Sequence, residues 1–171
     1  MIEYRNLKIA LLGAGNVGAQ VAQLLDEHGD ELASRVGAGL ELIGIAVRDV
    51  DADRTANIDR SLLTTDAESL ILSADIVIEL MGGIEPARTY ILQALHSGAD
   101  VVTGNKALLA LHGPELFEAA EQVGAQLYYE AAAGERFRSS ARFATVWPAT
   151  VSNASWASST APRTTFSTAW M

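Results

Sequence analysis

The chain has 171 residues, which is enough for one domain of ordinary size with a substantial core. Its 49% hydrophobic and 19% charged residues are typical of a globular protein rather than an intrinsically disordered one. The net charge of −9 argues against a nucleic-acid partner, and the absence of cysteine excludes disulfides. The sequence has no apolar run long enough to span a membrane and no signal peptide, so we expect a cytoplasmic chain with no membrane partner.

Strand and helix patterns alternate over residues 1–134. Short apolar runs predict buried strands over 7–12, 40–47, 76–80, 100–103 and 126–129. Helical spacing of apolar residues, with cap and stop signals, predicts helices over 17–28, 66–72, 85–96 (with Pro86 in the first turn) and 114–123. The polar residues 48–63 predict a surface loop. Repeated β-α units with short connections predict an α/β fold, a doubly wound parallel sheet of the Rossmann type.

Residues 13–18, with the sequence GAGNVG, form a GxGxxG motif between the first predicted strand and the first predicted helix. Gly13 permits a tight turn, Gly15 lets the backbone approach a pyrophosphate, and Gly18 lets the helix and the strand pack closely. The helix N-terminus offers free N–H groups to the anion. The alternative is a glycine-rich turn with no ligand, which this placement disfavours. The motif therefore places Gly13, Gly15, Asn16, Val17 and Gly18 at the turn and the helix start where a pyrophosphate would bind.

The end of the second strand indicates which dinucleotide is bound. An acidic residue there holds the ribose 2′-hydroxyl of NAD, whereas an arginine accommodates the 2′-phosphate of NADP. The sequence has Arg48 followed by Asp49, so Arg48 favours NADP and Asp49 leaves NAD open. The alternative is a pair of solvated loop charges.

Two more loops follow strands at the edge where parallel sheets bind ligands. Gly82, after the third strand, is expected to bring backbone close to the nicotinamide half of the cofactor. Lys106, after the fourth strand, is a candidate contact for a phosphate, a carboxylate or a carbonyl oxygen. The alternative for Lys106 is an exposed lysine, but a cation in the first turn of a helix opposes the helix dipole and needs another reason.

Several segments together closely resemble the amino-terminal domain of homoserine dehydrogenase over about residues 5–134. They are LLGAGNVGAQVAQLL, LELIGIAVRD, ADIVIELMGGIEPARTYILQALHSGADVVTGNKALLA and LYYEAAAG. The resemblance implies an NAD- or NADP-dependent oxidoreductase that interconverts L-homoserine and L-aspartate 4-semialdehyde, on the path to threonine, methionine and isoleucine. It implies that residues 13–18, Arg48 and Lys106 contact the cofactor, and that Glu130 and Ala133 supply two backbone carbonyls to a monovalent-cation site.

The family also has a second domain that binds homoserine, supplies a catalytic Asp and Lys, and forms the dimer. None of these catalytic residues has a counterpart here. Two alternatives to an active enzyme therefore stand, a catalytically inactive dinucleotide-binding fragment and another Rossmann oxidoreductase with a related amino-terminal domain.

The composition changes abruptly after Gly134. Residues 135–171 contain no Gly, Leu, Ile, Asp or Lys but hold all three Trp, so we expect a disordered, non-native tail that forms no domain. Read one base earlier, codons for Glu135–Ser140 can spell GAIPII, the family continuation, and those for Ser158–Phe166 can spell IVNGTANYI, which resembles another family stretch. We therefore infer a one-nucleotide deletion near codon 134, in the gene or in its sequencing. The alternative is a genuine, divergent tail.

Overall fold

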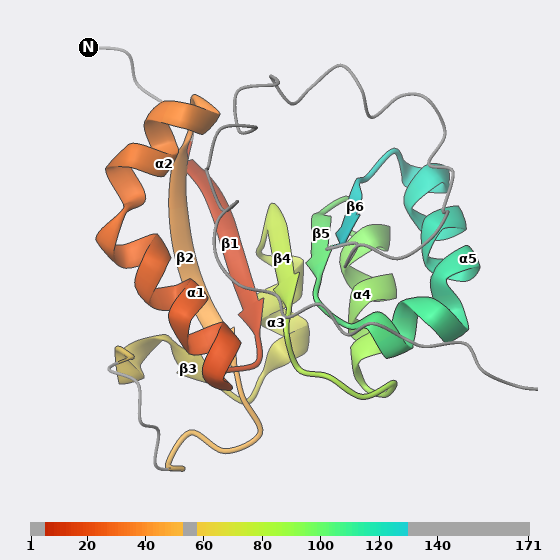
Figure 1. The fold of residues 1–171 in the computed structure, drawn as a ribbon, viewed down its shortest axis with the longest axis horizontal. Helices are drawn as coiled ribbons and strands as arrows, with labels where there is room; N and C mark the ends of the chain where they lie inside the picture. Colours follow the sequence, from red (N-terminus) through yellow and green to blue (C-terminus); the bar gives the residue numbers. More distant parts are fainter. Residues whose placement is uncertain (1–5, 53–57, 130–171) are drawn as a thin grey trace, which may run out of the picture. The chain divides into compact units, whose positions relative to one another are not determined.

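The computed structural model describes residues 6–52 and 58–129, which form an open parallel sheet with helices packed against it (Figure 1). The described residues contribute six strands in the spatial order β3-β2-β1-β4-β5-β6. The strand bounds are β1 (Asn6–Leu12), β2 (Gly39–Ala46), β3 (Leu63–Thr64), β4 (Ile76–Glu79), β5 (Asp100–Thr103) and β6 (Leu127–Tyr129). The order runs outward in both directions from β1, which confirms the doubly wound parallel sheet. The predicted tail, 135–171, lies outside the described residues.

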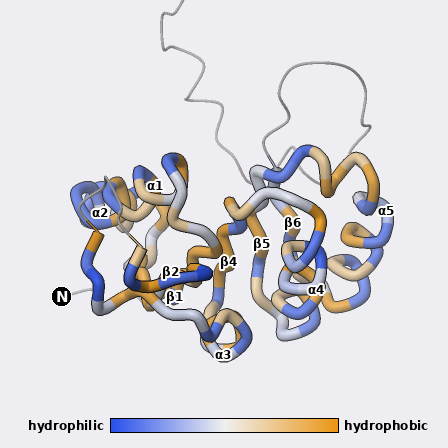
Figure 2. The backbone as a smooth tube through the Cα atoms, turned by 90° about the horizontal axis from the view of Figure 1, so that it is seen from below, coloured by the Kyte–Doolittle hydropathy of each residue, from blue (hydrophilic) through white to orange (hydrophobic). Residues whose placement is uncertain are grey.

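Helices lie against both faces of this sheet. Their bounds are α1 (Asn16–Glu27), α2 (Gly29–Val36), α3 (Ala67–Leu72), α4 (Ala87–His96) and α5 (Lys106–Val123). Figure 2 shows α1 and α2 on one side of the sheet and α3 and α4 on the other. In the two described stretches, no helix is both long enough and apolar enough to cross a membrane.

Alternate strand residues divide the core between the two faces. Leu12, Val77 and Val101 belong to the larger apolar cluster, which includes the inner sides of α3, α4 and α5. Leu11 belongs to a smaller cluster with Ala22 of α1. Both faces of the central strands are thus apolar, as a parallel sheet covered on both sides requires.

Helix α2 is absent from the sequence prediction. Helix α1 ends at Glu27, close to the predicted stop, but Gly29 begins a new helix instead of a loop. Asp30 and Glu31 in the first turn of α2 and Arg35 in its last turn all complement the helix dipole. The prediction was wrong because Gly29 indicates the end of one helix and carries no signal that another follows directly.

Helix α5 is longer than predicted. It begins at Lys106, where the Asn105 side chain accepts a hydrogen bond from the Leu108 N–H at 3.1 Å, and Pro114 lies inside it. The predicted start at Pro114 was wrong because a proline inside a helix removes one hydrogen bond without always ending the helix. Leu108 and Leu116, on either side of Pro114, are both fully buried, and this burial stabilises the helix across the proline.

Two smaller differences concern loops. The segment 48–63, predicted as a loop, includes a short 3-10 turn at Arg60–Leu62 and reaches the start of β3 at Leu63, which pairs with Ile45 of β2. Pro86, predicted in the first turn of α4, is instead the residue that precedes the helix.

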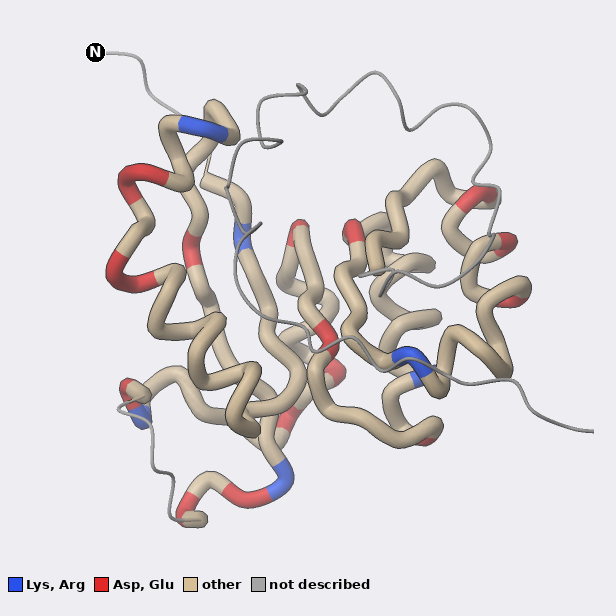
Figure 3. The backbone as a smooth tube through the Cα atoms, in the orientation of Figure 1, with Lys and Arg blue, Asp and Glu red and all other residues tan. Residues whose placement is uncertain are grey.

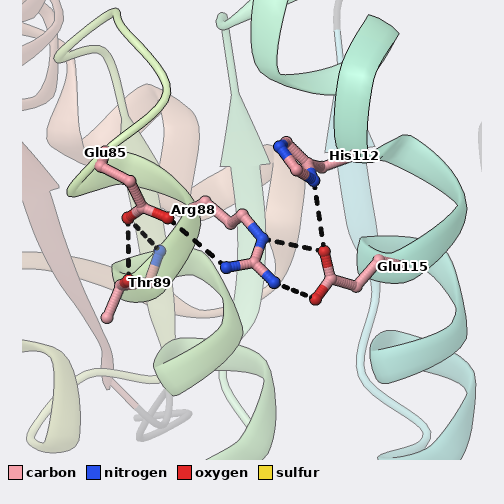
Figure 4. A network of polar contacts seen from close by, with 5 residues as sticks. All are labelled: Glu85, Arg88, Thr89, His112 and Glu115. Atoms are coloured by element: carbon pink, nitrogen blue, oxygen red, sulfur yellow. Dashed lines mark hydrogen bonds and ion pairs between the residues drawn. The ribbon is translucent and has the colours of Figure 1, made fainter.

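A charged network joins α4 to α5 (Figure 4). Arg88 Nε donates to Glu115 Oε2 at 2.8 Å, and a second guanidinium nitrogen donates to Glu115 Oε1, so the pair is bidentate. Arg88 Nη1 also lies 3.4 Å from Glu85 Oε1, and His112 Nδ1 lies 3.4 Å from Glu115 Oε2. The hydrogen bond from Arg88 holds the pKa of Glu115 below its ordinary value of 4.5.

We predict that Glu115→Gln lowers the stability of the chain at neutral pH and that this difference from the unaltered chain disappears in acid. Because the folded pKa of Glu115 is depressed, its ionised form stabilises the fold fully above the unfolded pKa, and this contribution is lost as the pH falls through the folded pKa. Urea denaturation at pH 7 and at a series of lower pH values measures the difference.

The matched control is Glu118→Gln on the same helix, where the carboxylate accepts a hydrogen bond from Gln122 within α5. A destabilisation by Glu115→Gln that is the same at every pH would show that the ion pair with Arg88 does not stabilise the fold.

Candidate dinucleotide-binding site

A cleft of about 810 Å³ lies at the carboxyl ends of the central strands. It is bordered by the turn after β1, the loop after β2, the loop after β4 and the start of α4. The strand order reverses between β1 and β4, and open α/β sheets bind ligands in the crevice at such a switch point. Among the predicted site residues, the cleft brings together Gly13, Gly15, Arg48 and Gly82.

The three glycines of the GxGxxG motif differ in how much space a side chain would find there. Gly13 has φ +103°, and a Cβ there would lie 3.0 Å from the carbonyl oxygen of Leu80, directly after β4. A Cβ at Gly18 would lie 2.1 Å from the Gly13 carbonyl oxygen, so the helix packs directly on the turn. A Cβ at Gly15 would meet no atom within 4 Å. Gly13 and Gly18 are therefore required by the fold, whereas Gly15 is free of such a requirement.

The N-terminus of α1 is open at the same place. Gly15 is its cap residue, with no side chain to accept a hydrogen bond, and Asn16 and Val17 in the first turn are exposed. By contrast, Asp66 caps α3 with an acceptor for the Ser69 N–H at 3.0 Å. The free N–H groups and the helix dipole of α1 thus form a site suited to an anion.

The loop after β2 carries a basic residue next to acidic ones (Figure 3). Arg48 and Asp49 are both exposed and both line the cleft. The Asp49 carboxylate accepts a hydrogen bond from the Asp51 N–H at 2.9 Å, so it helps to shape its own turn. Among the described residues that line the cleft, Arg48 supplies the positive charge.

The loop after β4 contributes backbone. Gly82 and Gly83 have φ values of +71° and +78°, a conformation that other residues rarely adopt, and both line the cleft. Lys106 is the first residue of α5 and is exposed, but it is not among the residues that line the cleft. A contact between Lys106 and the cofactor stays a prediction.

Glu79 is a residue that the sequence prediction missed. It is the last residue of β4 and is fully buried, and its carboxylate accepts hydrogen bonds from the Met81 N–H at 2.8 Å and the Thr103 hydroxyl at 2.6 Å. Asn105 extends this network at the start of α5. The available signal was a carboxylate inside the apolar strand sequence IVIEL, since a buried charge requires fixed partners.

The two residues expected to bind a monovalent cation, Glu130 and Ala133, lie outside the described residues. Among residues 6–52 and 58–129, no group of three or more His, Cys, Asp or Glu side chains is arranged to hold a metal ion.

Comparisons with known proteins all point to one family. The family model for "homoserine dehydrogenase, NAD binding domain" matches residues 13–130. The chain is 52% identical to the homoserine dehydrogenase of Corynebacterium glutamicum and 50% identical to that of Mycobacterium tuberculosis, over 126 residues in both cases. These matches cover 72% of this chain and 28% of each relative, so the chain spans less than a third of the length of the curated relatives it matches.

Two solved structures that match are homoserine dehydrogenases as well. The crystal structure of S. aureus homoserine dehydrogenase at pH 7.0 matches with a TM-score of 0.69 and 37% identity, over 75% of this chain and 33% of that one. The homoserine dehydrogenase from Thiobacillus denitrificans matches with a TM-score of 0.65 and 35% identity, over 76% of this chain and 30% of that one.

We predict that Gly15→Ala weakens NADPH binding by at least about tenfold and leaves the stability of the fold unchanged or slightly raised. Residue 15 has φ −72° and ψ −169°, which any residue adopts, and the added methyl group meets no protein atom but points into the space expected for the pyrophosphate. Gly29→Ala, a second open position away from the cleft, is the matched control.

Calorimetric titration with NADPH and thermal denaturation measure the two quantities separately. Gly18→Ala should lower stability, because its Cβ would collide with the Gly13 carbonyl oxygen. If Gly15→Ala binds NADPH as tightly as Gly29→Ala does, the glycine turn is not the phosphate site.

Proposed function

The chain belongs to the homoserine dehydrogenase family, and on that premise we propose that residues 6–129 bind NADP(H) as the cofactor domain of a cytoplasmic enzyme of this type. The observation that carries the proposal is the cleft at the switch point, where an uncapped helix N-terminus, the turn glycines Gly13 and Gly15 and the side chain of Arg48 meet.

We assign each part of the cofactor to residues that line the cleft or lie beside it. The pyrophosphate is assigned to residues 13–18, including the N–H groups of Asn16 and Val17, because these groups combine positive dipole and open space. The 2′-phosphate is assigned to Arg48, which is exposed and lines the cleft, and NAD remains the alternative through Asp49. The nicotinamide half is assigned to the side of Gly82 and Lys106.

In the full-length enzyme we propose hydride transfer between L-homoserine and L-aspartate 4-semialdehyde. Bound NADP would carry the hydride, and the residues described here would bind the dinucleotide and fix its orientation. Substrate binding, proton transfer, dimer formation and a monovalent-cation site that includes Glu130 and Ala133 would all need the part of the family enzyme beyond residue 129. The chain spans less than a third of its curated relatives, so it accounts for the cofactor-binding step only.

A second candidate function is a dinucleotide-binding fragment without catalysis. The change in composition after Gly134, and the family sequence recovered from residues 135–171 in a shifted reading frame, favour it for the chain as it stands. We propose that 1–134 corresponds to the family domain and that 135–171 is out of frame.

We predict that Arg48→Ala weakens NADPH binding by roughly tenfold to a hundredfold and leaves NADH binding within about twofold. The reason is that a 2′-phosphate needs a cation, whereas a 2′-hydroxyl does not. Parallel titrations with NADPH and NADH measure the two affinities, and Arg60→Ala, in the short turn before β3, is the matched control. Equal losses for both dinucleotides would remove Arg48 from its assigned role.

We predict that insertion of one nucleotide near codon 134 opens a long reading frame and yields a protein that oxidises homoserine with NADP. The unaltered chain, assayed in parallel, should produce NADPH no faster than a blank without enzyme, because positioning and proton transfer depend on the missing part. Resequencing the gene tests the reading frame, and the absorbance of NADPH measures homoserine oxidation. An early stop codon in the shifted frame would refute the deletion, and homoserine oxidation by the unaltered chain would refute the fragment.

A further inference from the structure

Glu79 is a buried carboxylate to which the proposed function assigns no part. It has no exposed surface and lies at the end of β4, next to the cleft. Oε1 accepts hydrogen bonds from the Met81 N–H at 2.8 Å and the Gly82 N–H at 3.3 Å, and Oε2 accepts one from the Thr103 hydroxyl at 2.6 Å. An isolated buried carboxylate is strongly unfavourable, so these three donors are what makes it tolerable.

The network continues from β5 into the start of α5. The Thr103 hydroxyl accepts a hydrogen bond from the Asn105 N–H at 3.0 Å. The Asn105 side chain donates to the Gly83 carbonyl oxygen at 2.6 Å and accepts from the Leu108 N–H at 3.1 Å. The loop after β4 and the loop after β5 are more than twenty residues apart in sequence. Two hydrogen bonds join them, one between Thr103 and Glu79 and one between Asn105 and Gly83.

One of the two joined loops, the loop after β4, borders the cleft. Gly82 and Gly83 line it, and without side chains they would have wide conformational freedom. The buried carboxylate instead holds the N–H groups of Met81 and Gly82 in fixed positions. The same network fixes the start of α5, and therefore the position of Lys106, relative to this loop.

We propose that Glu79 is a positioning residue for the nicotinamide half of the cofactor. It acts through the backbone of 81–83 and through Thr103 and Asn105, and it does not touch the dinucleotide itself. The proposal rests on the proposed function, because it assigns the nicotinamide half to the side of the cleft formed after β4. The glycine turn, which is assigned to the pyrophosphate, and Arg48, which is assigned to the 2′-phosphate, lie outside this network.

The test compares two ligands in the 171-residue chain. Adenosine 2′,5′-bisphosphate contains only the adenosine half, whereas NADPH contains both halves. Glu79→Gln keeps the shape of the side chain but removes the charge and one of its acceptor positions. We expect Glu79→Gln to weaken NADPH binding by about tenfold and to change the affinity for the bisphosphate by less than about twofold.

A second pair of variants covers the case in which Glu79→Gln does not fold. Thr103→Val removes the hydroxyl that joins the two loops and should show the same selective loss for NADPH. Thr103→Ser retains the hydroxyl and should restore NADPH binding. Ile91→Val, in the fully buried part of α4, is the control for a mild loss of stability and should leave the ratio of the two affinities unchanged.

The outcomes are separable. A selective loss for NADPH in Glu79→Gln, or in Thr103→Val with recovery in Thr103→Ser, supports the positioning role. Equal losses for both ligands, as from general destabilisation, or unchanged NADPH binding, overturn it. If the unaltered chain binds the bisphosphate and NADPH with the same affinity, the nicotinamide half gains nothing from this cleft and the inference is likewise wrong. If the unaltered chain binds neither ligand, the proposed function itself fails.

Discussion

The cleft depends on one steric constraint, the meeting of three backbone segments at Gly13. Its N–H donates to the Ala46 carbonyl oxygen at the end of β2 at 2.9 Å, its Cα faces the Leu80 carbonyl oxygen after β4, and its own carbonyl oxygen lies against Gly18 of α1. No side chain fits at either glycine without displacing backbone. This contact sets the separation of β1, β2 and β4 at their carboxyl ends, and so it sets the width and floor of the cleft.

The two halves of the cleft are fixed by different kinds of interaction. The half around Gly13 relies on close backbone contacts beside an apolar cluster that includes Leu11 and Ile45. The half after β4 relies on a buried polar network centred on Glu79, with Thr103 and Asn105. Close packing tolerates little variation in volume, whereas a hydrogen-bond network tolerates little variation in chemistry. Substitutions should therefore affect the two halves according to different rules.

The sequence predicted most of the fold because its signals are local. Each central strand is a short apolar run between turn residues. The spacing of the three glycines in the GxGxxG motif predicts the tight turn between a strand and a helix. Arg48 could be predicted as a candidate cofactor contact because it directly follows a predicted strand.

The features that were missed depend on contacts between distant residues. Glu79 and Thr103 stand opposite each other in the β4–β5 register, and that pairing is set by the sheet and not by either local sequence. The start of α5 was missed for a related reason, since Pro114 is a strong local signal that the burial of Leu108 and Leu116 overrides. Helix α2 was missed because Gly29, its first residue, is a local signal for the end of a helix.

At Gly15, the cap residue of α1, the stability of the fold and the binding of an anion favour different residues. A serine or aspartate at position 15 would cap the helix and restrict the unfolded chain, and each effect would stabilise the domain by a few tenths of a kcal/mol or more. The same side chain would occupy the space left open for a phosphate. Selection for thermal stability alone would therefore favour the loss of this glycine, whereas an open anion site requires that it is kept.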